Sequence, residues 1–204
     1  MKSPEPTDDI LPEADTRGSI EPASDIEPVG EIELFRQAFR RHATTVVIVT
    51  YFDGAGRPCG MTATSMCSLS ASPPSLLVSI GRASRAHAEI TERGRYGVNL
   101  LSVGQRSVAL HCSVPGMDKR LRDEWLAPDV PADATPRLRG SLAHLECVVD
   151  TSYEVFSHSL FVGLIQGVWL NPMDAPPLLY HGGVYSQLES VAERSERFHW
   201  ELQD

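Results

Sequence analysis

Hydroxyl side chains are concentrated between residues 60 and 74 of this 204-residue chain. The segment reads Gly-Met-Thr-Ala-Thr-Ser-Met-Cys-Ser-Leu-Ser-Ala-Ser-Pro-Pro, and apolar runs flank it at 45–51 and 75–80. A strand that carries Thr62 and Thr64 adds little to a hydrophobic core, but it presents hydroxyl and backbone groups to a polar, planar or phosphorylated ligand. From composition alone, a solvent-facing edge strand is the commoner explanation of the same residues.

A second candidate for ligand binding follows the later of these apolar runs. Ser84 has the type and position of a helix N-cap, the helix would run through Glu92, and Gly94 would end it. A hydroxyl and free backbone N–H groups at a helix start, with Arg82 and Arg85 beside them, suit an anion such as a phosphate. The alternative is a capped surface helix that carries two solvated arginines.

The remaining reactive side chains do not form the motifs of hydrolases, zinc proteins or Rossmann folds. No Gly-x-Ser-x-Gly, Gly-x-Gly-x-x-Gly or Walker pattern occurs, and none of the four cysteines is spaced as a metal-binding pair. We therefore expect four reduced thiols and no metal site. Glu146 lies in an apolar run, where a carboxylate is more often hydrogen-bonded by backbone or by a basic partner than catalytic.

The bulk properties favour one acidic domain. A chain of 204 residues suits a single domain with a substantial core. The formal net charge of −9 and the pI of about 5.2 argue against non-specific nucleic-acid binding, which needs a basic surface. No apolar run approaches the ~18 residues of a membrane span, and the N-terminus lacks the apolar core of a secretory signal. We therefore expect a cytoplasmic protein that does not insert into membranes.

The order of the elements predicts a mainly β fold with helices, and the absence of regular strand–helix alternation favours an antiparallel Greek-key barrel. The predicted strands are 45–51, 57–70, 76–80, 96–101, 142–156, 160–170 and 178–180, and the predicted helices begin near Ile32, Ser84, Ser102 and Asp118. Residues 1–30 are rich in Pro, Asp and Glu, which predicts a disordered acidic tail or, alternatively, a docking arm for a partner enzyme. The barrel domain is expected at 31–190, and a C-terminal tail or helix at 191–204.

Several short motifs occur in a specific order along the chain. They are Thr44–Thr50, Asp53-Gly54, Gly60–Ser65, Ser70–Pro74, Tyr96–Leu101 with Gln105, Leu142–Cys147, Ser157-His158, Phe161–Gly163 and Leu178–Tyr185. In this order and spacing the chain resembles the flavin reductase-like family, the small NAD(P)H:flavin oxidoreductases that feed two-component monooxygenases. The resemblance covers roughly residues 34 to 188.

This resemblance implies a fold, an activity and partners. The fold would be the FMN-binding split barrel, usually a homodimer with the flavin near the subunit interface. The activity would be reduction of FMN or FAD by NADH or NADPH, with the reduced flavin released to a separate monooxygenase. The alternatives are a flavin-binding protein of the same fold that reduces its own substrate, or one that is not an enzyme. The coenzyme stays open, because Arg137 and Arg139 suit either a 2′-phosphate or a solvated turn.

The resemblance also implies roles for particular residues. Ser84, with Arg82 or Arg85, would hold the flavin phosphate, and Asn99 and Gln105 would flank the flavin. The isoalloxazine edge and the ribityl chain would meet Thr62, Ala63, Thr64 and Ser65. The other expected cofactor-binding residues are Thr45, Met61, Ser68, Leu100, Lys119, Arg120, His158 and Tyr185, of which Tyr185 would stack near the nicotinamide.

His158 is the catalytic candidate that the resemblance indicates, and its motif departs from the family pattern. Many relatives have Gly-Asp-His before the Phe-x-Gly strand, with the His on the nicotinamide side, whereas this chain has Phe156-Ser157-His158. Ser157 can still orient an imidazole, but without an acidic neighbour the cationic form that would pair with a dinucleotide phosphate is less favoured. A structural His on a strand is the alternative.

Overall fold

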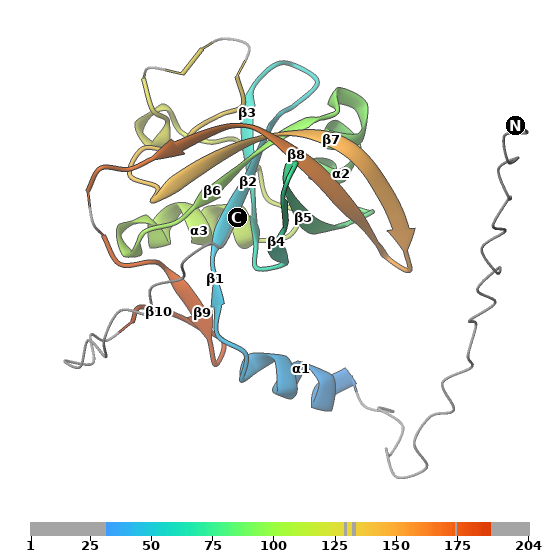
Figure 1. Ribbon diagram of the computed structural model, residues 1–204. Helices are drawn as coiled ribbons and strands as arrows, with labels where there is room; N and C mark the ends of the chain where they lie inside the picture. The colour runs from blue at the N-terminus through green and yellow to red at the C-terminus, as the bar shows by residue number, and fades with distance from the viewer. Residues whose placement is uncertain (1–31, 129, 132–133, 174, 189–204) are drawn as a thin grey trace, which may run out of the picture. The chain divides into compact units, whose positions relative to one another are not determined.

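The structure is a computed structural model that describes residues 32–128, 130–131, 134–173 and 175–188 (Figure 1). Residues 1–37 and residues 38–204 form two units. Helix α1 (Ile32–Arg40) crosses this boundary and confirms the helix predicted at Ile32, and its apolar residues Leu34 and Phe35 are exposed. The predicted tails at 1–30 and 191–204 lie outside the described residues.

Within the described residues, seven strands form one antiparallel sheet with the order β3-β2-β6-β7-β8-β5-β4. The strands are β2 (Val47–Phe52), β3 (Pro58–Ala63), β4 (Met66–Ala71), β5 (Pro74–Gly81), β6 (Arg95–Leu100), β7 (Ala143–Val155) and β8 (His158–Leu170). This arrangement confirms the predicted mainly β fold, although the predicted strand 57–70 is in fact two strands.

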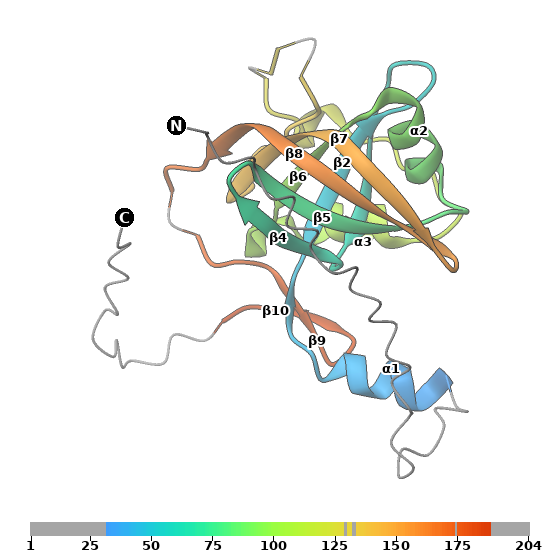
Figure 2. The ribbon, with the colours of Figure 1, turned by 45° about the vertical axis from the view of Figure 1, so that its right-hand side comes forward.

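The two edge strands of this sheet, β3 and β4, are consecutive in the chain. Only Thr64 and Ser65 separate them, and two residues span less than about 10 Å even when fully extended. The sheet must therefore curl until its edges approach each other, which produces a barrel that is split between β3 and β4 (Figures 1 and 2). The chain bends where the Ser65 hydroxyl donates a 2.8 Å hydrogen bond to the carbonyl of Ser79 on β5.

A second, smaller sheet contains the short strand that precedes β2 in the chain. Within the described residues it has the order β1-β9-β10 and contains β1 (Thr44–Thr45), β9 (Leu179–His181) and β10 (Val184–Ser186). Gly182 and Gly183 form the hairpin turn between β9 and β10 with φ angles of 64° and 87°, a conformation that glycine adopts without strain.

The helices begin and end largely where the sequence predicts. Helix α2 (Arg85–Arg93) has Ser84 as its N-cap and Gly94 in the left-handed conformation after its last residue, so both predicted signals are confirmed. Ser102 and Gln105 form a capping box at the 3₁₀ turn η1 (Val103–Gln105), which leads into α3 (Arg106–Ser113). The short helix predicted near Asp118–Trp125 is only the 3₁₀ turn η2 (Asp123–Trp125).

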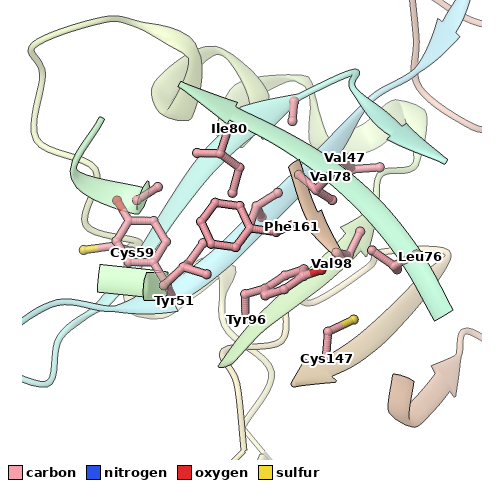
Figure 3. Packing of buried hydrophobic residues seen from close by; sticks show 14 residues of the cluster. Val47, Tyr51, Cys59, Leu76, Val78, Ile80, Tyr96, Val98, Cys147 and Phe161 are labelled. Atoms are coloured by element: carbon pink, nitrogen blue, oxygen red, sulfur yellow. The ribbon is translucent and has the colours of Figure 1, made fainter. Parts of the chain in front are cut away.

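Strand β2 is buried on both faces, because it separates the barrel interior from the layer under α3. Val47, Val49 and Tyr51 belong to the buried cluster of the barrel interior. Figure 3 shows Val47 and Tyr51 in this cluster together with Phe161. The alternate residue Ile48 packs instead with the buried face of α3. The continuous apolar run at 46–49 reflects this double burial, and it holds β2 and its neighbour β3 in place against α3.

Candidate functional site

Two clefts open beside strand β3 in the described part of the chain, and they share Thr62 and Ser113 as lining residues. The larger has a volume of about 880 Å³ and is called the basic cleft below; the smaller has a volume of about 410 Å³ and is called the aromatic cleft. Both volumes fall within the range of about 300–1,000 Å³ that is typical of small-molecule sites. The shared wall means that one ligand can extend from one cleft into the other.

The basic cleft lies between the start of α2, strand β3 with the preceding Arg57, and the loop after α3. The charged side chains that line it are four cations and one carboxylate. The cations are Arg57, Arg85, Lys119 and Arg120, and the carboxylate is Asp118. In a chain with a net charge of −9 this clustering favours an anionic ligand.

The start of α2 contributes Ser84 and Arg85 to the basic cleft. The Ser84 Oγ accepts a 3.1 Å hydrogen bond from the backbone N–H of His87, which fixes the helix start. Arg85 has no ion-pair partner within the described residues, so its guanidinium is available to an anion. Arg82, the third residue predicted at the phosphate, is instead paired with Glu154 at 2.9 Å and does not line the cleft.

The loop after α3 contributes the two predicted cations Lys119 and Arg120. The Lys119 ammonium donates to the carbonyls of Cys112, at 2.8 Å, and Val114, which closes the loop onto the end of α3. Partial burial lowers the pKa of Lys119. Arg120 is paired with Asp118 at 2.5 Å.

Arg57 is a cleft residue that the sequence prediction missed. It follows the β2–β3 turn, and its guanidinium pairs with Asp53 at 2.7 Å. Hydrogen bonds from the Arg57 side chain and backbone lower the pKa of Asp53 to about 2. The spacing of a turn Asp and an Arg four residues later was the signal that could have identified this pair.

The aromatic cleft is lined by apolar and aromatic side chains from several elements. Tyr180 on β9 and Tyr185 on β10 meet edge to face, with ring centroids 5.5 Å apart, and Val46 and Leu110 add apolar surface. Burial raises the pKa of Tyr185. Arg106 also lines this cleft, and neither Arg106 nor Tyr180 was among the predicted site residues.

The hydroxyl-rich segment reaches the clefts only in part. Thr62, Ala63 and Thr64 line the aromatic cleft, and Met61 lines the basic cleft, as Thr62 also does. Ser65 and Ser68 of this segment lie elsewhere, since Ser65 bonds the Ser79 carbonyl and Ser68 is exposed on β4. Two predicted residues outside the segment also line neither cleft: Thr45 pairs with Leu179 in the small sheet, and Leu100 packs against the barrel core.

Asn99 and Gln105, which the resemblance places beside the flavin, line neither of the two clefts. Asn99 is fully buried, where its side chain accepts from the N–H of Leu138 at 2.9 Å and donates to the Thr50 hydroxyl. Gln105 is also buried and bonds the backbone of Ser102 at 3.0 Å. Both side chains are used to hold loops onto the sheet.

His158 lies outside the lining of both clefts, at the first residue of β8. Its Nδ1 is 2.9 Å from the Ser157 hydroxyl, so Ser157 orients the ring. The ring lies over the backbone of Gly81, its register partner on β5. His158 is exposed there, and its partner Gly81 is the last residue of β5, shortly before Ser84 in the chain.

Two other charged residues have structural partners. Glu146 is paired with Arg95 at 2.6 Å and accepts from the N–H of Thr135, which confirms the expected hydrogen-bonded carboxylate. The Arg137 guanidinium stacks on Trp169 at 4.5 Å from the ring centroid, so it is not part of a solvated turn.

All four cysteines fall in the described part of the chain and are free thiols. Among the described residues, no group of three or more His, Cys, Asp or Glu side chains is arranged to hold a metal ion. None of the described helices is long and apolar enough to cross a membrane.

Comparison with known proteins identifies the family of the chain. The family model described as "Flavin reductase like domain" matches residues 39–189. An NADH-dependent flavin reductase of Rhodococcus sp is 33% identical over 172 residues, which are 83% of this chain and 93% of that protein.

Solved structures show the same fold. The Streptomyces globisporus NADH:FAD oxidoreductase SgcE6, in complex with NAD and FAD fragments, has a TM-score of 0.71 at 28% identity, covering 84% of this chain and 100% of that one. The styrene monooxygenase flavin reductase of Pseudomonas putida has a TM-score of 0.67 at 29% identity, covering 76% and 97%. The extent of the family match and the identity to these relatives show that this chain belongs to the flavin reductase-like domain family.

Proposed function

We propose that this protein is an NADH-dependent flavin reductase that supplies reduced flavin to a separate monooxygenase. The observation that carries the proposal is the junction at Thr62 and Ser113 of a cleft with aromatic walls and a cleft with cationic walls. A flavin nucleotide joins a planar ring to a phosphate and therefore fits both parts. Relatives named as NADH-dependent flavin reductases and a styrene monooxygenase reductase support the same conclusion.

The residues of the clefts would bind and orient the two substrates. Ser84, Arg85 and Lys119 would hold the phosphate, and the strand at Thr62 would meet the ring edge and the ribityl chain. Tyr185 would pack against an aromatic ring. A bound flavin supplies the hydride-accepting chemistry, so the protein needs to supply alignment and exclusion of water rather than a nucleophile or a strong acid.

NADH is proposed over NADPH. The two arginines that could have met a 2′-phosphate are engaged elsewhere, since Arg137 stacks on Trp169 and Arg139 donates to the carbonyl of Leu126. The names of the relatives support the same choice.

The assembly is proposed to be a cytoplasmic homodimer. Strand β4 is an uncharged, exposed sheet edge with Leu69 54% exposed, and natural proteins usually cover or charge such edges. A second copy of the chain would cover it. Free thiols at all four cysteines support a reducing compartment.

Steady-state oxidation of NADH and NADPH under air tests the function. FMN and then FAD are added at several concentrations, and turnover should depend on added flavin and saturate with it. NADH should be preferred. A preparation that binds flavin but does not oxidise either nucleotide would contradict the proposal, and turnover that ignores added flavin would indicate a protein with a permanently bound cofactor.

A further inference from the structure

The side chain of Arg57 is held rigidly at the basic cleft by a buried carboxylate. Asp53 is 3% exposed, and its Oδ1 accepts from the backbone N–H groups of Ala55 and Arg57 at 3.0 and 2.9 Å. Its Oδ2 accepts from the Nε and Nη2 of Arg57 at 2.9 and 2.7 Å. A guanidinium has five N–H donors, so this fork leaves three of them for a ligand.

The turn that carries Arg57 is fixed to helix α2. Arg93 donates to the Asp53 carbonyl at 2.6 Å, and Glu89 accepts from the N–H of Gly54 at 3.0 Å. The same helix begins at Ser84, on another wall of the basic cleft. Arg57 and the phosphate-binding helix start therefore belong to one rigid frame.

Arg120 is placed beside Arg57 by backbone pairing. The N–H of Gly60 donates to the carbonyl of Lys119 at 2.9 Å, and the N–H of Leu121 donates to the carbonyl of Pro58 at 2.9 Å. The chain at Arg120 thus runs along β3 directly after Arg57. This wall of the cleft carries two guanidinium groups that are oriented by carboxylates, Arg57 by Asp53 and Arg120 by Asp118, whereas Arg85 at the start of α2 has no ion-pair partner within the described residues.

The same part of the cleft also offers apolar surface. Met117 lines it and is 62% exposed, and Pro115 lies in the same loop. A flexible thioether packs well against a flat aromatic ring, whichever way the ring is turned. Cations next to exposed apolar surface match the chemistry of a diphosphate linked to an adenosine.

We propose that Arg57 and Arg120 form a second anion subsite, beyond the phosphate site at Ser84 and Arg85, which binds the diphosphate of a dinucleotide. The ligand is FAD or NADH, which carry the same adenosine diphosphate group. Arg57 is then a specificity residue that favours dinucleotides over mononucleotides. This inference rests on the proposed function, because it assigns a part of the substrate to the same cleft.

Direct binding measurements on the full chain test the subsite without turnover. FAD, FMN and ADP are titrated by calorimetry into the wild type, Arg57→Gln and a matched control, Arg95→Gln. Arg95 is also ion-paired and has a similar side-chain exposure of 44%, against 50% for Arg57, but it lies outside both clefts. Arg57→Gln should weaken FAD or ADP binding roughly tenfold and FMN binding less than about twofold, while Arg95→Gln should change none of them.

Kinetics then separates the two sources of the diphosphate. With FMN as acceptor, KM is measured for NADH and for reduced nicotinamide mononucleotide. If NADH uses the subsite, Arg57→Gln raises the KM for NADH and leaves the KM for reduced nicotinamide mononucleotide unchanged. If FAD uses the subsite, Arg57→Gln raises the KM for FAD instead, measured with FAD as the acceptor. Absence of turnover in the wild type would overturn the proposed function but leave the binding test intact.

Two further variants keep the test decisive if Arg57→Gln is poorly folded. Arg120→Gln should produce the same selective loss, and Asp53→Asn, which keeps the Oδ1 acceptor of the turn, should produce a smaller one. Equal weakening of FMN and FAD would overturn the inference, because Arg57 would then serve the first phosphate. Unchanged binding of FAD and ADP, together with an unchanged KM for NADH, in all three variants would overturn it as well.

Discussion

The Thr62 hydroxyl donates a 2.7 Å hydrogen bond to the carbonyl of Ala109, which ties strand β3 to helix α3 at the wall that both clefts share. This hydroxyl therefore uses its only proton in a hydrogen bond within the protein and cannot donate it to a ligand. What Thr62 offers a ligand is a lone pair, a methyl group and its backbone. The sequence suggests that the Thr62 hydroxyl contacts a ligand, but in the structure this hydroxyl holds β3 against α3 and so positions the wall of the site.

Replacing Thr62 by Val tests this role, because Val keeps the shape and removes the hydrogen bond. We expect Thr62→Val to lower the free energy of unfolding by about 1 kcal/mol and to change the flavin KM less than about threefold. Thr62→Ser, which keeps the hydroxyl, should keep more of the stability. Chemical denaturation and steady-state kinetics measure both quantities. Unchanged stability with a flavin KM raised more than about tenfold would mean that the hydroxyl serves the ligand instead.

Arg85 should act on the flavin phosphate alone. Its guanidinium has no ion-pair partner within the described residues and lines the basic cleft, so Arg85→Gln removes a charge-assisted contact to an anion. We expect FMN and FAD to bind roughly tenfold more weakly, whereas riboflavin, which lacks a phosphate, should bind as before. Fluorescence titration measures the three affinities. Arg122→Gln is the control, since Arg122 is exposed, ion-paired with Glu124 and outside both clefts; a loss of riboflavin binding in Arg85→Gln would contradict the assignment.

Local signals in the sequence were sufficient for most elements of the fold. Ser84 and Gly94 bound α2 because a side-chain acceptor and a residue that tolerates positive φ are needed at its two ends. The break in the predicted strand 57–70 was not visible, because Thr64 and Ser65 have ordinary strand propensity. That break depends on the closure of the barrel, in which Ser65 reaches the distant Ser79.

The site was predicted less completely, for the same physical reason. Asn99 and Gln105 have the polar side chains expected near a ligand, but buried loops also need such side chains to satisfy their backbone groups. Arg57 and Tyr180 reach the clefts through a turn and a hairpin whose placement depends on long-range pairing. Residue type therefore indicated the chemistry, while tertiary structure decided which side chains take part.

His158 is expected to influence nucleotide binding and not the hydride step. Its ring is oriented by Ser157 but lies outside the lining of both clefts, and hydride transfer to a flavin needs no protein acid. We expect His158→Ala to raise the KM for NADH about three- to tenfold and to leave kcat within about twofold. Steady-state kinetics at saturating flavin measures both. His158→Gln, which can still bond Ser157, is the matched variant, and a fall in kcat of more than about a hundredfold in His158→Ala would place the imidazole in the chemical step.

His144 should make stability depend on pH. The Asn99 Oδ1 accepts a hydrogen bond from the N–H of Leu138, which identifies this atom as the amide oxygen. The same oxygen lies 3.1 Å from the His144 Nδ1, so Nδ1 carries the proton and donates it. The Nε2 of the neutral ring then accepts from the Thr135 hydroxyl at 3.2 Å. Both ring nitrogens are thus satisfied in the neutral form. Burial lowers the pKa of His144 from 6.5 to about 4; nearby Arg137 adds to this shift and Glu146 opposes it.

The sign of the effect follows from the proton counts of the two states. Between pH 6.5 and about 4 the unfolded chain binds a proton at His144 and the folded chain does not, so stability falls as the pH falls through this window. The full loss amounts to about 3 kcal/mol below pH 4. Urea denaturation at several pH values measures the slope, which His144→Gln should reduce and the exposed His181→Gln should leave unchanged. An equal slope in wild type and His144→Gln would show that other groups cause the dependence; Asp53, whose pKa is about 2, titrates below this window.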